Sequence, residues 1–148
     1  MCPALPLAAG SAVSGQVLTA SQLSNAKNIY DAGLSLRLPQ RAEVIAIATA
    51  MQESELLNVP YGDEDSLGLF QQRPSRGWGT PSEVMDPRYA ATAFYTRLVR
   101  VPGWQSLPLT VAAQDVQQSR HPDAYAQWEP LATAAVATFS GDGALCSG

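Results

Sequence analysis

The residue whose surroundings most clearly predict chemistry is Glu53, a carboxylate at the end of an otherwise apolar stretch. It follows Ala50 by three residues and Thr49 by four, so in a helix these residues would share one face. Apolar surroundings disfavour a charged carboxylate and raise its pKa. A general acid that works near neutral pH requires such a carboxyl group. The alternative is that Glu53 marks the point where the helix emerges into water.

A second group of acidic residues lies in the glycine-punctuated segment Gly62-Asp63-Glu64-Asp65-Ser66-Leu67-Gly68-Leu69-Phe70-Gln71-Gln72. Asp63 or Asp65 could face Glu53 across a cleft and hold a water, as inverting glycoside hydrolysis requires. The alternative is a solvated loop tip. A calcium loop fails as a third interpretation, because Pro74 stands where an EF-hand needs its bidentate Glu. The sequence therefore predicts no metal site.

The elements that must position these residues read as helices. Caps, prolines and glycines predict helix starts at Thr19 or Ser21, Pro39, Thr80, Asp86, Thr110 and Pro122. We expect the first helix to stop near Gly33 and the last to be kinked or interrupted at Pro130.

The predicted fold class is mainly α, with about six helices around a central buried one. The central helix carries the run Val44 to Met51, which is apolar nearly all round. Between residues 58 and 79 the helical pattern gives way to an irregular or short-hairpin lobe, and loops of this length are often functional. An irregular segment over 1–18, one domain over 19–141 and a tail over 142–148 complete the chain.

Composition excludes several classes of protein. The 148 residues are 46% hydrophobic and 15% charged, which argues against disorder, and the apolar runs are too short to insert in a membrane. A net charge of −4 with scattered cations argues against a nucleic-acid surface. Cys2 and Cys146, at opposite ends of the chain, are expected to form a disulfide in an oxidising compartment; two free thiols are the alternative.

The pair Glu53-Ser54, followed by Ser66-Leu67-Gly68-Leu69-Phe70-Gln71-Gln72, resembles the lysozyme-like superfamily, with soluble lytic transglycosylases and goose-type lysozymes nearest. The run from Ile45 to Trp78 is similar to lysozyme-like domains of secreted actinobacterial cell-wall hydrolases. The resemblance covers about residues 20–138 and implies a lysozyme-like α+β fold, with the catalytic domain over 19–141.

The resemblance also implies roles for individual residues. Glu53 matches the general acid, and Asp63 resembles an aspartate that helps to hold the attacking water. Gln71 and Tyr95 match positions that contact sugar or the acid. Three further residues of the lobe over 58–79 are candidates for contact with substrate: Ser66, Gln72 and Trp78, the last of which could stack on a sugar or anchor the loop.

Two features depart from the family pattern. Arg73 stands near the place of a second goose-type acid, so that acid is missing. The transglycosylase Ala-Tyr-Asn block is expected near residues 113–115, where this sequence has Ala-Gln-Asp. The sequence therefore leaves open which product forms.

The function implied by the resemblance is cleavage of the β-1,4 bond between N-acetylmuramic acid and N-acetylglucosamine in peptidoglycan. Water held by Asp63 or Asp65 would give hydrolysis, whereas attack by the muramic 6-hydroxyl would give a 1,6-anhydro product; neither route needs a cofactor. We expect a secreted monomer that acts on peptidoglycan glycan strands at the cell wall. A non-catalytic glycan-binding module and a structural part of a wall-remodelling machine are the alternatives.

Overall fold

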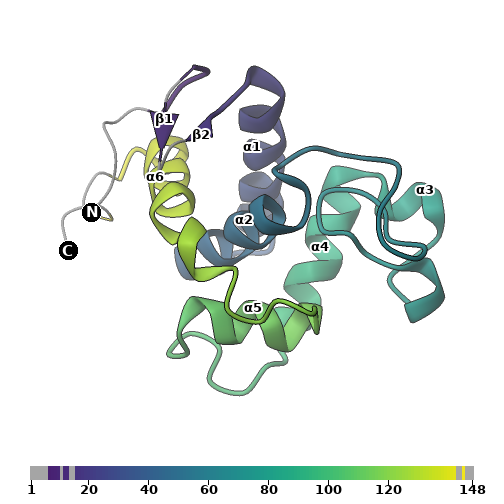
Figure 1. The fold of residues 1–148 in the computed structure, drawn as a ribbon. Helices are drawn as coiled ribbons and strands as arrows, with labels where there is room; N and C mark the ends of the chain where they lie inside the picture. The colour runs from purple at the N-terminus through teal and green to yellow at the C-terminus, as the bar shows by residue number, and fades with distance from the viewer. Residues whose placement is uncertain (1–6, 11, 14–15, 143–144, 146–148) are drawn as a thin grey trace.

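The computed structural model describes residues 7–10, 12–13, 16–142 and 145. In this part of the chain the structure is mainly helical, as the sequence predicts (Figure 1). The α-helices are α1 (Ala20–Ser35), α2 (Gln40–Ser54), α3 (Pro81–Val84), α4 (Pro87–Leu98), α5 (Leu109–Gln117) and α6 (Glu129–Ser140). Two short 3₁₀ helices, η1 (Pro74–Arg76) and η2 (Ala126–Trp128), and two strands, β1 (Ala12–Val13) and β2 (Gln16–Val17), complete the set.

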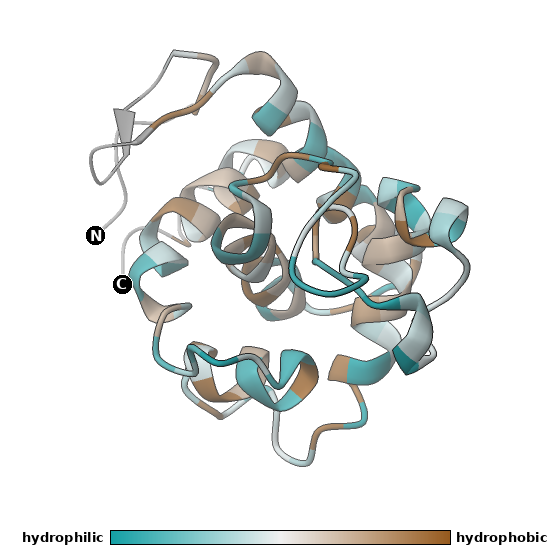
Figure 2. Cartoon of the chain, turned by 45° about the vertical axis from the view of Figure 1, so that its right-hand side comes forward, coloured by the Kyte–Doolittle hydropathy of each residue, from teal (hydrophilic) through white to brown (hydrophobic). Residues whose placement is uncertain are grey.

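Helix α2 is the central element, and α1, α4, α5 and α6 all pack against it. Every residue from Ala42 to Met51 is buried, as the nearly continuous apolar run predicts. The hydropathy colouring of Figure 2 alternates along the surrounding helices, as expected of helices with one buried face. The end of α2 is therefore held rigidly by its neighbours.

Local capping signals fix several helix starts. Thr19 and Thr80 each form a capping box, with Gln22 and Glu83 respectively, and the Asp86 carboxylate accepts from the backbone N–H of Arg88. The structure confirms these three predicted helix starts. They were predictable because each capping signal lies within a few residues of sequence.

Helix α1 ends two residues beyond Gly33, close to the predicted end, but the glycine itself is not the stop. The helix passes through Gly33 and reaches Ser35. A Cβ atom at Gly33 would lie 2.7 Å from Cγ of Glu43 and 2.9 Å from the hydroxyl oxygen of Tyr95. This glycine thus permits close packing of α1 against its neighbours and does not end the helix.

Three other local expectations need correction. The last helix begins at Glu129 and not at the expected Pro122, because the intervening residues form turns and the 3₁₀ helix η2. Pro130 is its second residue, where the missing N–H costs nothing, so it does not kink the helix. Within the segment predicted to be irregular, Ala12 pairs with Val17 and Val13 with Gln16 in a small antiparallel hairpin.

The lobe over residues 58–79 is irregular but firmly anchored. Leu67 and Gln72 form an isolated antiparallel bridge, so the expected short hairpin is reduced to a single bridged pair. Phe70 is fully buried and stacks on Phe94 of α4, with ring centroids 5.0 Å apart. Ser54 Oγ, at the end of α2, lies 2.8 Å from the Leu69 carbonyl oxygen. The lobe is thereby fixed against the end of the central helix.

No helix in the described ranges is both long enough and apolar enough to span a bilayer. The predicted disulfide between Cys2 and Cys146 lies outside the residues that the structure describes.

Candidate active site

Glu53 lies in the last turn of α2, and one of its carboxylate oxygens is held by two donors. The Tyr125 hydroxyl lies 2.7 Å from Glu53 Oε2, and Gln117 Nε2 lies 3.0 Å from the same oxygen. Gln117 comes from the end of α5 and Tyr125 from the segment before η2. Three separate parts of the chain thus meet at this carboxylate.

The other oxygen, Glu53 Oε1, makes no hydrogen bond with any described residue. Glu53 also lines an open cleft. A proton on Oε1 can therefore be given to a bound molecule while Oε2 continues to accept from Gln117 and Tyr125.

Burial raises the pKa of Glu53 above its ordinary value, and this effect exceeds three opposing ones. The hydrogen bonds from Gln117 and Tyr125 and the nearby His121 lower this pKa. Burial also raises the pKa of Tyr125, so its hydroxyl stays protonated as a donor. The site therefore favours a protonated Glu53 whose conjugate base is also stabilised, which suits a group that gives up a proton and regains it.

Tyr125 belongs to a longer chain of hydrogen bonds. Its hydroxyl oxygen lies 2.9 Å from Ser119 Oγ, which also lies 3.0 Å from Oε1 of Gln114. Because the Tyr125 proton is directed at Glu53, the single Ser119 proton is donated either to Tyr125 or to Gln114. The His121 backbone N–H donates to Ser119 Oγ at 3.2 Å. Because Tyr125 is fully buried, this chain fixes the position of its hydroxyl beneath Glu53.

The cleft at Glu53, here called the acid cleft, has a volume of about 370 Å³. Three other candidate residues line it, namely Asp63, Ser66 and Gln71, and its lining also includes Gln117, Ser119 and His121. The structure therefore brings the helix end and the lobe together as the sequence predicts, with an additional wall from α5 and the segment after it. In the described part of the chain, no cluster of three or more His, Cys, Asp or Glu side chains is placed to hold a metal ion.

Gln71, which lines the acid cleft, is held in place by two backbone carbonyl groups of the lobe. Its side-chain Nε2 donates to the carbonyl oxygens of Tyr61 and Gly68, at 3.0 Å and 3.2 Å. A Cβ atom on Gly62 would lie 1.8 Å from Gln71 Oε1, so only glycine allows this side chain to cross the loop.

Asp65 has a different environment from Asp63. Its Oδ1 accepts from Arg73 Nε at 2.6 Å and its Oδ2 accepts from the Ser75 backbone N–H at 2.8 Å. These bonds hold the pKa of Asp65 well below its usual range, chiefly through Arg73. Both oxygens are occupied in bracing the loop, whereas the Asp63 carboxylate has no hydrogen-bond partner among described residues.

Gln72, Tyr95 and Trp78 lie outside the acid cleft. Gln72 is buried and donates to the Ala90 carbonyl oxygen at 2.9 Å, and the fully buried Tyr95 donates to that of Ile29 at 2.8 Å. Trp78 lines a neighbouring cavity, where the Arg97 guanidinium lies 3.5 Å from the ring centroid. Tyr95 therefore does not touch Glu53; the tyrosine that does so is Tyr125.

No motif in the sequence marks Gln117 or Tyr125 as a site residue. Their amide and phenol are the functional groups of the Asn and Tyr in the block that is absent near residues 113–115. Here the amide comes from the end of α5 and the phenol from the segment after it. No short-range spacing signals this arrangement, because both residues reach Glu53 only through the packing of α5 and α6 around α2.

Sequence similarity does not identify the site. The chain matches no protein-family model and no curated protein. Any function assigned to the acid cleft therefore rests on its geometry and on the residues that form it.

Proposed function

We propose that this chain is a peptidoglycan-cleaving glycosidase of the lysozyme-like kind, with Glu53 as its general acid. The observation that carries the proposal is the asymmetric carboxylate, with Oε2 bound by Tyr125 and Gln117 and Oε1 free beside an open cleft. The substrate is the β-1,4-linked glycan strand, cleaved between N-acetylmuramic acid and N-acetylglucosamine. A secreted protein at the cell wall is the setting that this activity requires.

Protonated Glu53 would donate from Oε1 to the glycosidic oxygen as the bond to the anomeric carbon breaks. Positive charge then develops at that carbon, and a carboxylate beside it would stabilise that charge. Donation from Tyr125 and Gln117 to Oε2 stabilises the carboxylate that remains.

The second step has two possible forms. In hydrolysis, Asp63 would hold the attacking water, because it lines the cleft and its oxygens are not occupied as those of Asp65 are. In intramolecular attack, the muramic 6-hydroxyl closes on the anomeric carbon and gives a 1,6-anhydro product. The second route needs only Glu53, which would act first as acid and then as base.

The deciding experiment is incubation of purified peptidoglycan with the wild-type chain, with Glu53→Gln and with the control Glu55→Gln. Glu55 is the exposed neighbour beyond the end of α2. We expect Glu53→Gln to reduce release of soluble fragments by at least about 10²-fold, because loss of a general acid costs that much, and Glu55→Gln to retain activity. Circular dichroism checks that both variants are folded.

Mass spectrometry of the released fragments then separates the outcomes. Reducing muropeptides indicate hydrolysis, and fragments lighter by one water indicate intramolecular attack. Full activity of Glu53→Gln would refute the assignment of the acid. Binding of wild-type protein to intact sacculi without any release would instead support a non-catalytic glycan-binding module.

A further inference from the structure

A second cavity, here called the arginine pocket, adjoins the acid cleft and has a volume of about 340 Å³. Among the described residues it is lined by Trp78 and three arginines, Arg73, Arg76 and Arg97, and by no acidic side chain. The acid cleft and the arginine pocket share four wall residues: Gln71, Arg73, Gln117 and Gln118. One of these, Gln117, directly contacts Glu53, so the arginine pocket lies next to the part of the cleft that holds the acid.

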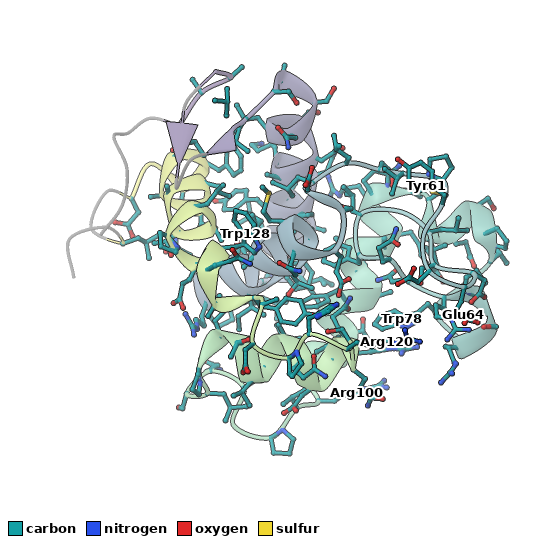
Figure 3. The ribbon with its side chains drawn as sticks, viewed as in Figure 1. Tyr61, Glu64, Trp78, Arg100, Arg120 and Trp128 are labelled. Carbon is teal, nitrogen blue, oxygen red and sulfur yellow. The ribbon has the colours of Figure 1, made fainter. Side chains whose placement is uncertain are left out.

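The distribution of charge around the pocket is unusual for this chain. The protein has a net charge of −4 and nine Lys and Arg residues. Five of these line the two cavities and the adjacent hollow beside α4, namely Arg73, Arg76, Arg97, Arg100 and Arg120. Figure 3 shows Arg100 and Arg120 in the same part of the view as Trp78.

The arginines of the pocket differ in their partners. Arg73 is paired with Asp65 at 2.6 Å and with Glu64 at 3.5 Å. Arg76 and Arg97 form no ion pair with any described residue. Arg97 donates to the Gly77 carbonyl oxygen at 3.1 Å and stacks on Trp78, which fixes the plane of its guanidinium. An oriented guanidinium without an acidic partner is suited to bind an anion from solution.

We propose that the arginine pocket binds a carboxylate carried by the muramic acid residue of the glycan strand. The proposal rests on the proposed function, because it assumes that a glycan occupies the adjacent acid cleft. Two carboxylates share this chemistry: the lactyl group of an unsubstituted muramic acid and the terminal groups of an attached peptide. The pocket would thus distinguish peptidoglycan from an uncharged N-acetylglucosamine polymer.

The test is calorimetric titration of the Glu53→Gln protein, in which slow turnover does not disturb the titration, with three tetrasaccharides. The first is tetra-N-acetylchitotetraose, which has no carboxylate. The second is peptide-free (GlcNAc–MurNAc)₂, which keeps the lactyl carboxylate. The third is the same tetrasaccharide with stem peptides, in which the lactyl group is amidated and only the peptide carboxylates are free.

We expect at least one of the two anionic tetrasaccharides to bind about tenfold more tightly than chitotetraose, as one charge-assisted hydrogen-bonded contact allows. The anionic ligand that shows the preference identifies which carboxylate is bound. Raising the salt concentration should reduce the preference, because the arginines are partly exposed.

Arg76→Gln and Arg97→Gln, each added to Glu53→Gln, test the pocket itself. Each should reduce the preference at least about threefold, a size expected of a partly exposed ion pair. Arg88→Gln is the matched control, because Arg88 lies on α4 with Arg97 but lines none of these cavities. Arg97→Lys, which keeps the charge but not the planar stack, should restore the preference only in part.

Equal affinities for the three tetrasaccharides, or a preference unchanged by Arg76→Gln, would overturn the proposal. Arg76 is exposed, so its replacement should not prevent folding. If the wild-type chain cleaves no peptidoglycan and yet binds the anionic tetrasaccharides through Arg76, the proposed function fails and the arginine pocket stands. If the wild-type chain cleaves peptidoglycan but shows no preference for the anionic tetrasaccharides, the proposed function is supported and the proposal for the arginine pocket fails.

Discussion

At the scale of single residues, the orientation of Glu53 depends on the two N–H bonds of one side-chain amide. Gln117 Nε2 donates to Glu53 Oε2 at 3.0 Å and to the Phe70 carbonyl oxygen at 2.9 Å. Both of its N–H bonds are therefore directed at acceptors, and this fixes which end of the amide faces the acid. Through Gln117 the acid of α2 is linked directly to the backbone of the lobe.

The hydroxyl of Tyr125 should set the pH range over which Glu53 can act as an acid. Its hydrogen bond to Oε2 lowers the pKa of Glu53. In Tyr125→Phe that bond is lost, the pKa of Glu53 rises, and the acid stays protonated to higher pH. We expect the alkaline limb of the pH–rate profile to move up by about one pH unit, the size of one hydrogen bond to a charged group.

Tyr89→Phe is the control for this measurement, because Tyr89 is an exposed tyrosine on α4 away from the acid cleft. Its alkaline limb should coincide with that of the wild type. A Tyr125→Phe profile that keeps the wild-type limb, or moves it to lower pH, would contradict the role assigned to the hydroxyl.

The sequence could reveal Glu53 but not its partners, and the reason is physical. A carboxylate after an apolar helical run is a local signal, visible over four residues. Tyr125 lies 72 positions from Glu53 and in irregular structure, so no periodicity connects them. The sequence could also place Asp63 and Asp65 in one loop, but only the bonds from Arg73 and Ser75 distinguish them.

At the scale of elements, α1 holds the turn that follows α2. Glu55 and Leu56 both adopt left-handed backbone conformations, with φ of 59° and 60°. Their carbonyl oxygens accept from the side-chain amides of Gln22 and Asn25, at 2.8 Å and 2.7 Å. Two side chains of α1 thus stabilise the strained turn that follows the last residue of α2, Ser54, and so help to fix the helix end that carries Glu53.

Gly68 should be the most sensitive position of the lobe. Its φ is +81°, and a Cβ atom there would lie 2.5 Å from the Val84 carbonyl oxygen. Gly68→Ala combines left-handed backbone strain with a clash against backbone that cannot move easily. We expect the free energy of unfolding to fall by about 2–4 kcal/mol in urea denaturation, more than backbone strain alone costs.

Gly103→Ala separates the two causes. Gly103 has a similar φ of +69° but no heavy atom within 4 Å of the added Cβ. Its replacement should cost only the strain, about 1 kcal/mol. Equal losses in the two variants would show that the contact with Val84 contributes nothing.

Element boundaries were predictable where the determining contacts are local. The capping boxes at Thr19 and Thr80 are complete within four residues and mark their helices correctly. Gly33 looks like a helix stop, but its role is set by Glu43 and Tyr95, which belong to other helices. The bridge between Leu67 and Gln72 similarly depends on how the lobe is anchored to α4.

At the scale of the whole molecule, a second carboxyl group is buried between α1, α2 and α4. Glu43 is 1% exposed, and its Oε2 has no hydrogen-bond partner among described residues. Burial raises the pKa of Glu43 to about 7. This carboxyl is therefore protonated in the folded protein at pH values where the unfolded chain has already lost the proton.

The linkage makes stability fall as pH rises. Below about pH 4.5 the carboxyl is protonated in both states; between about 4.5 and 7 only the folded state keeps the proton. The free energy of unfolding should decrease by about 3 kcal/mol across this range from Glu43 alone. Glu43→Gln removes this titration, so its stability should depend less steeply on pH.

Urea denaturation of the wild type and of Glu43→Gln at several pH values between 4 and 8 gives the two slopes. Glu53 is present in both proteins, so its own contribution cancels in the comparison. Parallel curves would mean that Glu43 titrates alike in the folded and unfolded chains.

The arrangement of the site also has a consequence for the order in which the protein is made. Glu53 leaves the ribosome early, but Gln117, Tyr125 and the whole of α6 are translated long afterwards. Until then the nascent chain has an apolar α2 without α6 to cover it and an acid without its donors. A growing chain that has not yet reached Gln117 and Tyr125 therefore lacks both donors that hold Glu53, and these donors become available only shortly before α6 does.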